Sequence, residues 1–325
     1  MKTAKFFWQY FKQYKLAFLV VMIMIIISTV LQVLFPIFTG LAISELVELG
    51  SAFASGKLAS GDVSAFAAFQ GIMWNLALAF IFLSLSSLIY MLLMSRIISY
   101  STNEMRKGLF GKLARLTVSF FDRHQDGDIL SRFTSDLDNI LQAFNESLVQ
   151  VMSNIALYIG LIVIMFMRHA TLAWVTIAST PVAIIVLVSI VKLARKYTDL
   201  QQKEVGQLNA YMDETISGQK VVIVQGMQEE VIKGFVQQND KVRSATFKGR
   251  AFAGLLFPVM NGMSLINTAI VIFVGSAIML NDPNVKTSVA IGLISTFTQF
   301  SQQYYQPIIQ VAASWGSLQL AFTGA

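Results

Sequence analysis

Cysteine is absent from this 325-residue sequence, and histidine occurs only twice. Without cysteine the chain can form neither a disulfide framework nor a thiolate metal site. The two histidines, His124 and His169, stand far apart in the sequence, and neither belongs to a pattern typical of metal ligands. We therefore expect no metal site.

Charge is scarce as well. Only 13% of the residues are charged and 55% are hydrophobic, whereas an average soluble domain has about 25% charged and about 45–50% apolar residues. A water-soluble fold is therefore not expected. The net charge of +6 would fit nucleic-acid binding only if the basic residues formed a continuous face or stripe.

Six long uncharged stretches occupy much of the chain. Each exceeds the roughly 20 residues that a helix needs to cross a hydrocarbon core of about 30 Å. They predict an all-α membrane protein with six long transmembrane helices in one transmembrane domain, residues 1–325. With their helical extensions, the predicted spans cover approximately residues 16–49, 66–117, 128–167, 170–212, 223–281 and 287–325.

Basic residues gather on alternate connections between these spans. Twenty-one of the 24 Lys and Arg residues lie in the N-terminal arm or in the charged segments Arg96–Glu146 and Lys192–Arg250. The short loops hold the other three, Lys57, Arg168 and Lys286. The positive-inside rule then places both termini and both long segments in the cytoplasm. Topology accounts for the basic charge, so we expect no nucleic-acid partner and an integral membrane protein, in a bacterial plasma membrane.

The two long charged segments are themselves helical in pattern. They combine mixed charge with regularly spaced apolar residues and contain no proline, which predicts two cytoplasmic helical hairpins with short tip helices. At the first tip, Phe120 and Phe121 form an aromatic pair. Gly127 there suits a left-handed helix end, and Asp128 can cap the next helix. The second tip falls within Asp213–Val222. Plain solvated turns are the alternative, but an exposed aromatic pair usually meets a partner.

The first tip carries a specific pattern. Residues 120–136 read Phe-Phe-Asp-x4-Gly-Asp-Ile-x-Ser-Arg-x-Thr-x-Asp, which resembles the first intracellular loop of type IV ABC exporters. The segment 214–222, followed by two glutamates and Phe235, resembles their second loop. The stretch 307–321 resembles their last transmembrane helix. The resemblance therefore covers essentially the whole chain.

In that family the two tips are coupling helices that sit in grooves on the ATPase domains, the second tip on the partner subunit. The resemblance thus implies a dimer, either homodimeric or heterodimeric, with ABC ATPase domains as partners. Carried onto this chain, it implies the following coupling residues: Phe120, Phe121, Asp122, Arg123, His124, Gln125, Asp126, Glu214, Thr215, Ile216, Ser217, Gly218, Gln219 and Lys220.

The phosphate-binding loop of an ATPase is missing from the sequence. The nearest match, Gly50–Lys57, has five residues between its glycines instead of four and is followed by Leu58. We therefore expect no catalytic residue, no cofactor and no enzyme activity in this chain. ATP and Mg would bind to a nucleotide-binding domain expected after Ala325. On this reading the sequence is a fragment of a longer protein, and a separate permease that recruits its ATPase is the alternative.

Polar and aromatic residues line the fifth and sixth predicted spans, where lipid would not favour them. We interpret them as the wall of a substrate cavity, although polar contacts between packed helices are the alternative for any single residue. No Asp or Glu lies inside an uncharged span, which disfavours ion-coupled carriers and selective channels. The predicted cavity residues are Phe257, Met260, Asn261, Ser264, Thr296, Gln299, Phe300, Gln303 and Tyr304.

These observations favour the membrane-spanning half of an ATP-driven exporter. It would move an amphipathic or hydrophobic substrate, such as a drug, lipid or peptide, by alternating access. One alternative is a scaffold or regulatory membrane subunit that transports nothing and has a dry, filled interior. A less favoured alternative is a secondary transporter.

Overall fold

The computed structural model describes residues 14–56, 66–117, 119–120, 126–131, 134, 137–138, 149–279 and 285–323. All regular structure in these ranges is helical, as the sequence predicts. The chain forms two compact units, one built from Met1–Thr176 and Asn267–Ala325 and the other from Ile177–Ile266.

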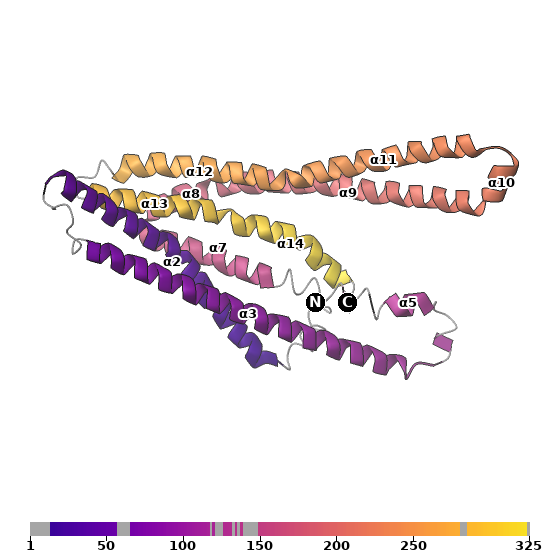
Figure 1. Cartoon of the computed structure of the whole chain (residues 1–325), viewed down its shortest axis with the longest axis horizontal. Coiled ribbons are helices and arrows are strands. Elements are labelled where there is room, and N and C mark those ends of the chain that lie inside the picture. Colours follow the sequence, from indigo (N-terminus) through magenta and orange to yellow (C-terminus); the bar gives the residue numbers. More distant parts are fainter. Residues whose placement is uncertain are drawn as a thin grey trace. The chain divides into compact units, whose positions relative to one another are not determined.

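The first unit is a bundle around α2, which contacts α3, α7 and α13; α14 in turn contacts α7 (Figure 1). The bounds of its helices are α2 Lys15–Ala54, α3 Ala67–Leu113, α5 Asp126–Ser131, α7 Val149–Arg168, α8 Ala170–Ala178, α13 Thr287–Tyr304 and α14 Gln306–Thr323.

The contact between α2 and α3 is apolar over most of its length. Val21 and Ile25 of α2 are buried in the same cluster as Met94, Ile97 and Ile98 of α3. Further along the contact, the hydroxyls of Ser28 and Ser87 share a hydrogen bond of 3.1 Å. Because lipid chains are as apolar as these side chains, close packing and interhelical hydrogen bonds hold such helices together.

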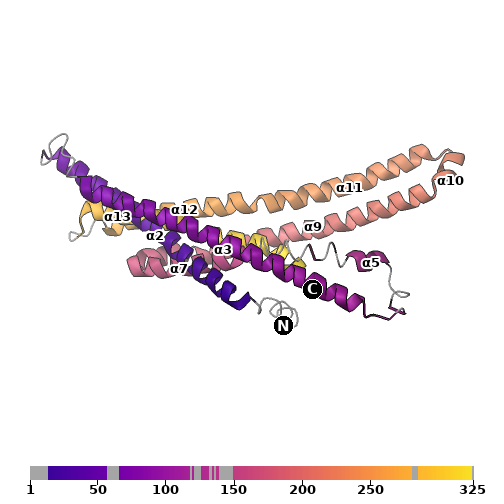
Figure 2. The ribbon, with the colours of Figure 1, turned by 60° about the horizontal axis from the view of Figure 1, so that its bottom comes forward.

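The second unit is a long helical hairpin. It contains α9 (Thr180–Ser217), α10 (Gln219–Val224), α11 (Gln228–Gly254) and the first part of α12 (Leu256–Met279). Helices α9 and α11 run side by side, and α10 joins their far ends (Figures 1 and 2). The hairpin thus confirms a long helical extension of the fourth and fifth predicted spans.

Two aromatic residues of α9 fix the register of this hairpin. The Tyr197 ring stacks on Phe252 with centroids 5.3 Å apart and planes 6° apart. The Tyr211 hydroxyl donates to the Val231 carbonyl at 2.9 Å, and its ring covers Gly234, where a Cβ atom would collide with it. These contacts explain why a helix pair this long remains together along its polar length.

Proline interrupts three spans that the sequence analysis treated as continuous helices. Helices α9, α12 and α14 each begin just after a break, and Pro181, Pro258 and Pro307 lie in their first turns. Proline has no N–H to donate and its ring clashes with the carbonyl four residues earlier, whereas in a first turn neither effect matters. Each of the predicted spans 170–212, 223–281 and 287–325 thus contains a break before a proline, and their bounds stay predictions.

Other boundaries shift by a few residues. Helix α2 continues to Ala54 instead of ending at 49, and α9 continues to Ser217 instead of 212. Gly50 stands at the expected end of α2 but keeps right-handed helical geometry, and the left-handed glycine after this helix is Gly56. No proline or glycine occurs at the expected end of α9. Of the predicted span 128–167, the part from 139 to 148 lies outside the described residues.

Within the described ranges, five helical segments are long and apolar enough to cross a membrane: Lys15–Ala54, Ala67–Leu113, Val149–Arg168, Ala170–Ser217 and Gln228–Ile278. Such segments identify an integral membrane protein. The sixth predicted span is helical as α13 and α14, but its many Gln, Ser and Thr residues dilute its hydropathy. The count of six crossings therefore stays a prediction.

Candidate functional site

The first tip is only partly described. Phe121, Asp122, Arg123, His124 and Gln125 lie outside the described residues. Phe120 is half-buried, and Asp126 opens the short helix α5.

The local expectation for Gly127 at this tip is corrected. Gly127 lies inside α5 instead of ending a helix, and the left-handed glycines of the described part are Gly56 and Gly226. Because α5 begins at Asp126, Gly127 has right-handed helical geometry and Asp128 lies within the helix instead of capping it.

The second tip is fully described, and its short helix comes later in the sequence than expected. Helix α9 continues to Ser217 and α10 begins at Gln219, with Gly218 between them. Of the predicted coupling residues, Glu214, Thr215, Ile216 and Ser217 form the last turn of α9, whereas Gln219 and Lys220 begin α10.

A left-handed glycine ends α10. Gly226 has φ of +67°, and its N–H donates to the Ile223 carbonyl at 3.3 Å. The Met227 N–H donates to the Val222 carbonyl at 3.0 Å. These two bonds form the Schellman motif, in which glycine avoids the steric cost of a positive φ. The motif sharply reverses the chain into α11.

The tip exposes four apolar side chains, of which Ile216 is a predicted coupling residue and Val221, Ile223 and Val224 are not. Ile216, Val221, Ile223 and Val224 are 66%, 58%, 57% and 86% exposed. Apolar residues gathered at one exposed end of an otherwise charged hairpin are typical of a protein contact surface. The available signal was the uninterrupted apolar run from Val221 to Val224 between charged segments.

Helix α13 presents the polar half of the predicted cavity wall in the first unit. Thr296, Phe300 and Tyr304 are buried, and Gln299 and Gln303 are half-buried. Phe300 packs edge-on against Phe297, with ring centroids 5.7 Å apart. The five predicted residues of α13 thus share one helix, within a bundle of apolar neighbours.

Gln299 is tied to α2. Its Nε2 donates to the Thr39 hydroxyl at 2.6 Å. That hydroxyl donates in turn to the carbonyls of Phe35 and Pro36, at 3.2 and 2.9 Å, one turn back along the same helix. The Thr39 hydroxyl therefore bonds to its own helix and accepts a hydrogen bond from Gln299 at the same time.

Tyr304 belongs to a cluster of tyrosines. Its hydroxyl shares a hydrogen bond of 2.7 Å with the Tyr158 hydroxyl of α7, and their ring centroids are 5.1 Å apart. The Tyr305 ring packs edge-on against Tyr304 at 5.6 Å. Tyr158 and Tyr305 were not selected from the sequence, because nothing in the pattern of the third span places it beside the sixth.

Several buried polar atoms near this surface have no hydrogen-bond partner among the described residues: Asn267 Oδ1, Thr268 Oγ1 and Gln303 Oε1. The Nδ2 of Asn267 is satisfied, since it donates to the Thr176 carbonyl at 3.3 Å and to the Ser301 hydroxyl at 2.9 Å. A buried acceptor without a donor costs free energy, so such atoms mark places that water or a ligand would fill.

The other predicted cavity residues, on α12, belong to the second unit and are described by themselves. Met260 and Ser264 are buried, whereas Phe257 and Asn261 are exposed. Their spacing places Phe257, Met260 and Ser264 on one face of α12. Asn261, four residues after Phe257 and three before Ser264, lies on the same face but is exposed.

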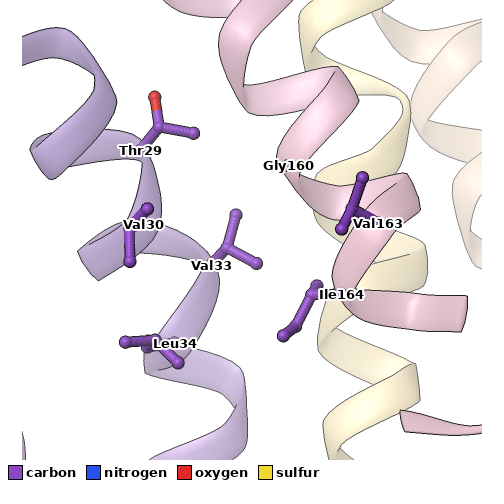
Figure 3. A pocket seen from close by; sticks show the side chains of 7 residues that line it. All are labelled: Thr29, Val30, Val33, Leu34, Gly160, Val163 and Ile164. Atoms are coloured by element: carbon purple, nitrogen blue, oxygen red, sulfur yellow. The ribbon is translucent and has the colours of Figure 1, made fainter. Parts of the chain in front are cut away.

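An apolar groove of about 240 Å³ lies between α2 and α7 in the first unit (Figure 3). The two helices approach closely here, because a Cβ atom on Gly160 would lie 3.1 Å from the Thr29 methyl group. The groove is lined by Thr29, Val30, Val33, Leu34, Gly160, Val163 and Ile164. These side chains offer contacts to alkyl groups but no group for acid, base or metal chemistry. Among the residues that the structure describes, no cluster of His, Asp or Glu could hold a metal ion.

Comparison with known proteins decides the family. A sequence profile described as the ABC transporter transmembrane region matches residues 18–308. The chain belongs to this family. This match confirms the resemblance to the transmembrane domain of type IV ABC exporters.

Individual members of the family resemble the chain at about the same level. An uncharacterized ABC transporter ATP-binding protein of Bacillus subtilis, YfiC, is 27% identical over 99% of the chain and 50% of its own length. A fatty acid ABC transporter ATP-binding/permease protein of Mycobacterium bovis is 27% identical over 68% of the chain and 34% of its own length. The ATP-dependent lipid A-core flippase of Escherichia coli K12 is 27% identical over 59% of the chain and 32% of its own length. The chain thus spans half or less of these relatives.

Proposed function

We propose that this ABC transporter domain is the membrane-spanning half of an ATP-driven exporter. Six crossings from each of two subunits would form a pathway that opens alternately to either side of the membrane. The observation that carries this proposal is the polar surface of α13, where buried Gln303 Oε1 has no partner among the described residues. A surface of this kind inside an apolar bundle suits contact with a polar group of a substrate.

The substrate that fits best is an amphipathic, lipid-like molecule. The names of two relatives include fatty acid and lipid A-core. The α13 surface offers amide and hydroxyl groups beside aromatic rings, which suits a neutral polar group attached to an apolar body. The uncharged spans contain no Asp or Glu. A carrier driven by a proton or sodium gradient would therefore have no acidic side chain there to bind the coupling ion.

ATP hydrolysis would be supplied by partners. ABC ATPase domains would bind ATP and Mg, and the cytoplasmic tips would transmit their movement to the spans. At the second tip, Val221, Ile223 and Val224 expose the apolar surface that a groove on such a domain could cover. At the first tip, the region of Phe120 and Phe121 would have the same role.

A non-transporting scaffold is the second candidate. It predicts a dry interior in which every buried polar atom has a protein partner. Of the seven buried side-chain oxygens that have no partner among the described residues, three lie on α12 and α13, which supports transport over this alternative.

The test uses the chain joined to its ATPase domain and reconstituted in lipid vesicles. A fluorescent phospholipid should cross the bilayer in an ATP-dependent way and should stimulate ATP hydrolysis. Gln303→Leu should weaken that stimulation, whereas Gln302→Leu, at an exposed neighbouring position, should not. Equal behaviour of the two variants, or no substrate-stimulated hydrolysis by the unaltered protein, would favour the scaffold.

A further inference from the structure

Five positive charges gather where α9 and α11 leave their uncharged stretches. Lys192, Arg195 and Lys196 follow the last apolar run of α9, and Lys248 and Arg250 precede the apolar run that begins at residue 251. All five side chains are exposed. The nearest acidic residue in sequence is Asp199, one turn beyond Arg195 and Lys196, and no ion pair between described residues joins it to either of them.

The packing of α9 against α11 places the cations of the two helices at the same height along the hairpin. Gly249 lies against the backbone of α9, where its Cβ would be 3.5 Å from the Tyr197 carbonyl carbon. The Tyr197–Phe252 stack fixes the same register. As a result, the Nζ atoms of Lys196 and Lys248 lie 5.9 and 5.8 Å from the centroid of the Tyr197 ring.

These charges have no carboxylate partner in the described part of the chain. The ion pair found in this hairpin joins Arg243 to Asp240 at 3.1 Å, further along α11, and none involves Lys196 or Lys248. An aromatic ring attracts exposed ammonium groups only weakly, and two ammonium groups facing one ring repel each other. An anion placed beside both lysines would relieve that repulsion.

The surroundings of the cluster identify the source of such an anion. Val188, Val191 and Leu193 expose apolar surface on α9, and Phe247 is 73% exposed next to Lys248 on α11. A phosphate that carries acyl chains can satisfy both the cations and this apolar surface, whereas a free phosphate satisfies only the cations. Basic residues at the cytoplasmic end of membrane helices attract anionic lipid in this way.

We propose that Lys196 and Lys248, with Tyr197 between them, bind the phosphate of an anionic phospholipid at the cytoplasmic surface of the membrane. Lys192, Arg195 and Arg250 add to the attraction from the same level. This site lies outside the predicted transport cavity, and its occupant is a resident lipid of the inner leaflet. The proposal does not depend on which substrate is exported or on whether the chain transports at all.

The hairpin offers a matched control. Lys248 lines one end of a surface hollow of about 380 Å³, whose lining residues Lys241, Glu204 and Asp240 lie further from the apolar stretches. Lys203 and Lys241 carry the same charge as Lys196 and Lys248, but each lies seven residues further from the apolar stretch of its helix, about 10 Å away. Removing them changes the net charge equally without touching the proposed site.

The experiment measures lipid binding to the purified chain by native mass spectrometry. Phosphatidylglycerol and phosphatidylcholine with identical acyl chains are titrated separately. The unaltered chain should prefer phosphatidylglycerol. Lys196→Gln with Lys248→Gln should weaken phosphatidylglycerol binding by roughly 10- to 30-fold, since each cation near an anionic surface contributes a factor of about three to five, and should leave phosphatidylcholine binding unchanged.

Lys203→Gln with Lys241→Gln should change neither affinity by more than about twofold, because these lysines lie about 10 Å, or about one Debye length, further from the apolar stretches. Equal losses in both double variants would mean that net charge alone attracts the lipid and would overturn the proposal. Displacement of phosphatidylglycerol by an equal concentration of inorganic phosphate would assign the site to a soluble anion instead. If the first double variant does not purify, Lys248→Gln against Lys241→Gln gives the same comparison.

Discussion

Gly40 of α2 and Gly292 of α13 lie so close that neither has room for a side chain. A Cβ atom on Gly292 would be 2.5 Å from the Gly40 carbonyl oxygen and 2.8 Å from the Ser44 Cβ. The Thr296 hydroxyl donates back to the Gly292 carbonyl at 2.9 Å. Small residues four positions apart on both helices permit this approach, as in other membrane helix pairs. The crossing fixes the helix that carries the polar surface against α2.

Alanine at position 292 should therefore destabilise the chain. We expect Gly292→Ala to lower the free energy of unfolding by about 1–3 kcal/mol, because the added methyl group must push two backbones apart. The measurement is thermal unfolding of the purified protein in detergent. Gly71→Ala on α3 is the control, since no atom lies within 4 Å of the added methyl group there. Equal unfolding temperatures for the two variants would mean that the helices separate without cost.

The hydrogen bond between Gln299 and Thr39 gives a second prediction. Thr39→Val removes the acceptor of the 2.6 Å bond and should destabilise the chain by about 0.5–1.5 kcal/mol. Thr39→Ser keeps the hydroxyl and should retain most of that stability. In a double-mutant cycle with Gln299→Leu, the two losses should be less than additive. Strict additivity would show that the bond contributes nothing.

The sequence predicted the helical class and the membrane location because both depend on local properties. Long uncharged runs identify membrane helices by length alone. The breaks before Pro181, Pro258 and Pro307 were equally local, and reading each proline as a first-turn residue would have found them.

Contacts between distant spans could not be predicted in the same way. The partnership of Tyr158 with Tyr304 depends on how α7 lies against the sixth span, which no periodicity within either segment determines. The short tip helix was predicted too early in the sequence because Ser217 and Gly218 suggested a turn. In the structure α9 ends at Ser217, and the tip helix α10 begins at Gln219. The decisive signal was Gly226, whose positive φ ends the short helix.

Orientation in the membrane is open to a direct test, because the chain has no native cysteine. The Lys and Arg distribution predicts that Lys286, which pairs with Glu48 at 3.2 Å, lies outside the cell. Cysteine at position 286 should react with an impermeant reagent added to intact cells. Cysteine at position 216, at the exposed second tip, should react only after the membrane is opened. The reverse pattern would invert the topology.

The last prediction concerns the apolar tip at α10. In a protein that carries the ATPase domain, Ile223→Ser with Val224→Ser should abolish most substrate stimulation of ATP hydrolysis while leaving substrate affinity nearly unchanged. The reason is that movement passes from one domain to another only through a filled contact, and losing buried anchor residues commonly costs about 2 kcal/mol or more of binding. Ile223 and Val224 are 57% and 86% exposed, so a partner domain can bury both side chains.

Val236→Ser provides the matched control for this pair, because Val236 is 51% exposed on α11 of the same hairpin but lies away from the tip. It should leave stimulation, transport and affinity intact. Substrate affinity, stimulated hydrolysis and transport must be measured on the same preparations, so that a loss of coupling is separated from a loss of binding. If the tip variant keeps normal stimulation, or if Val236→Ser loses as much, α10 is not the element that joins the spans to the ATPase domain.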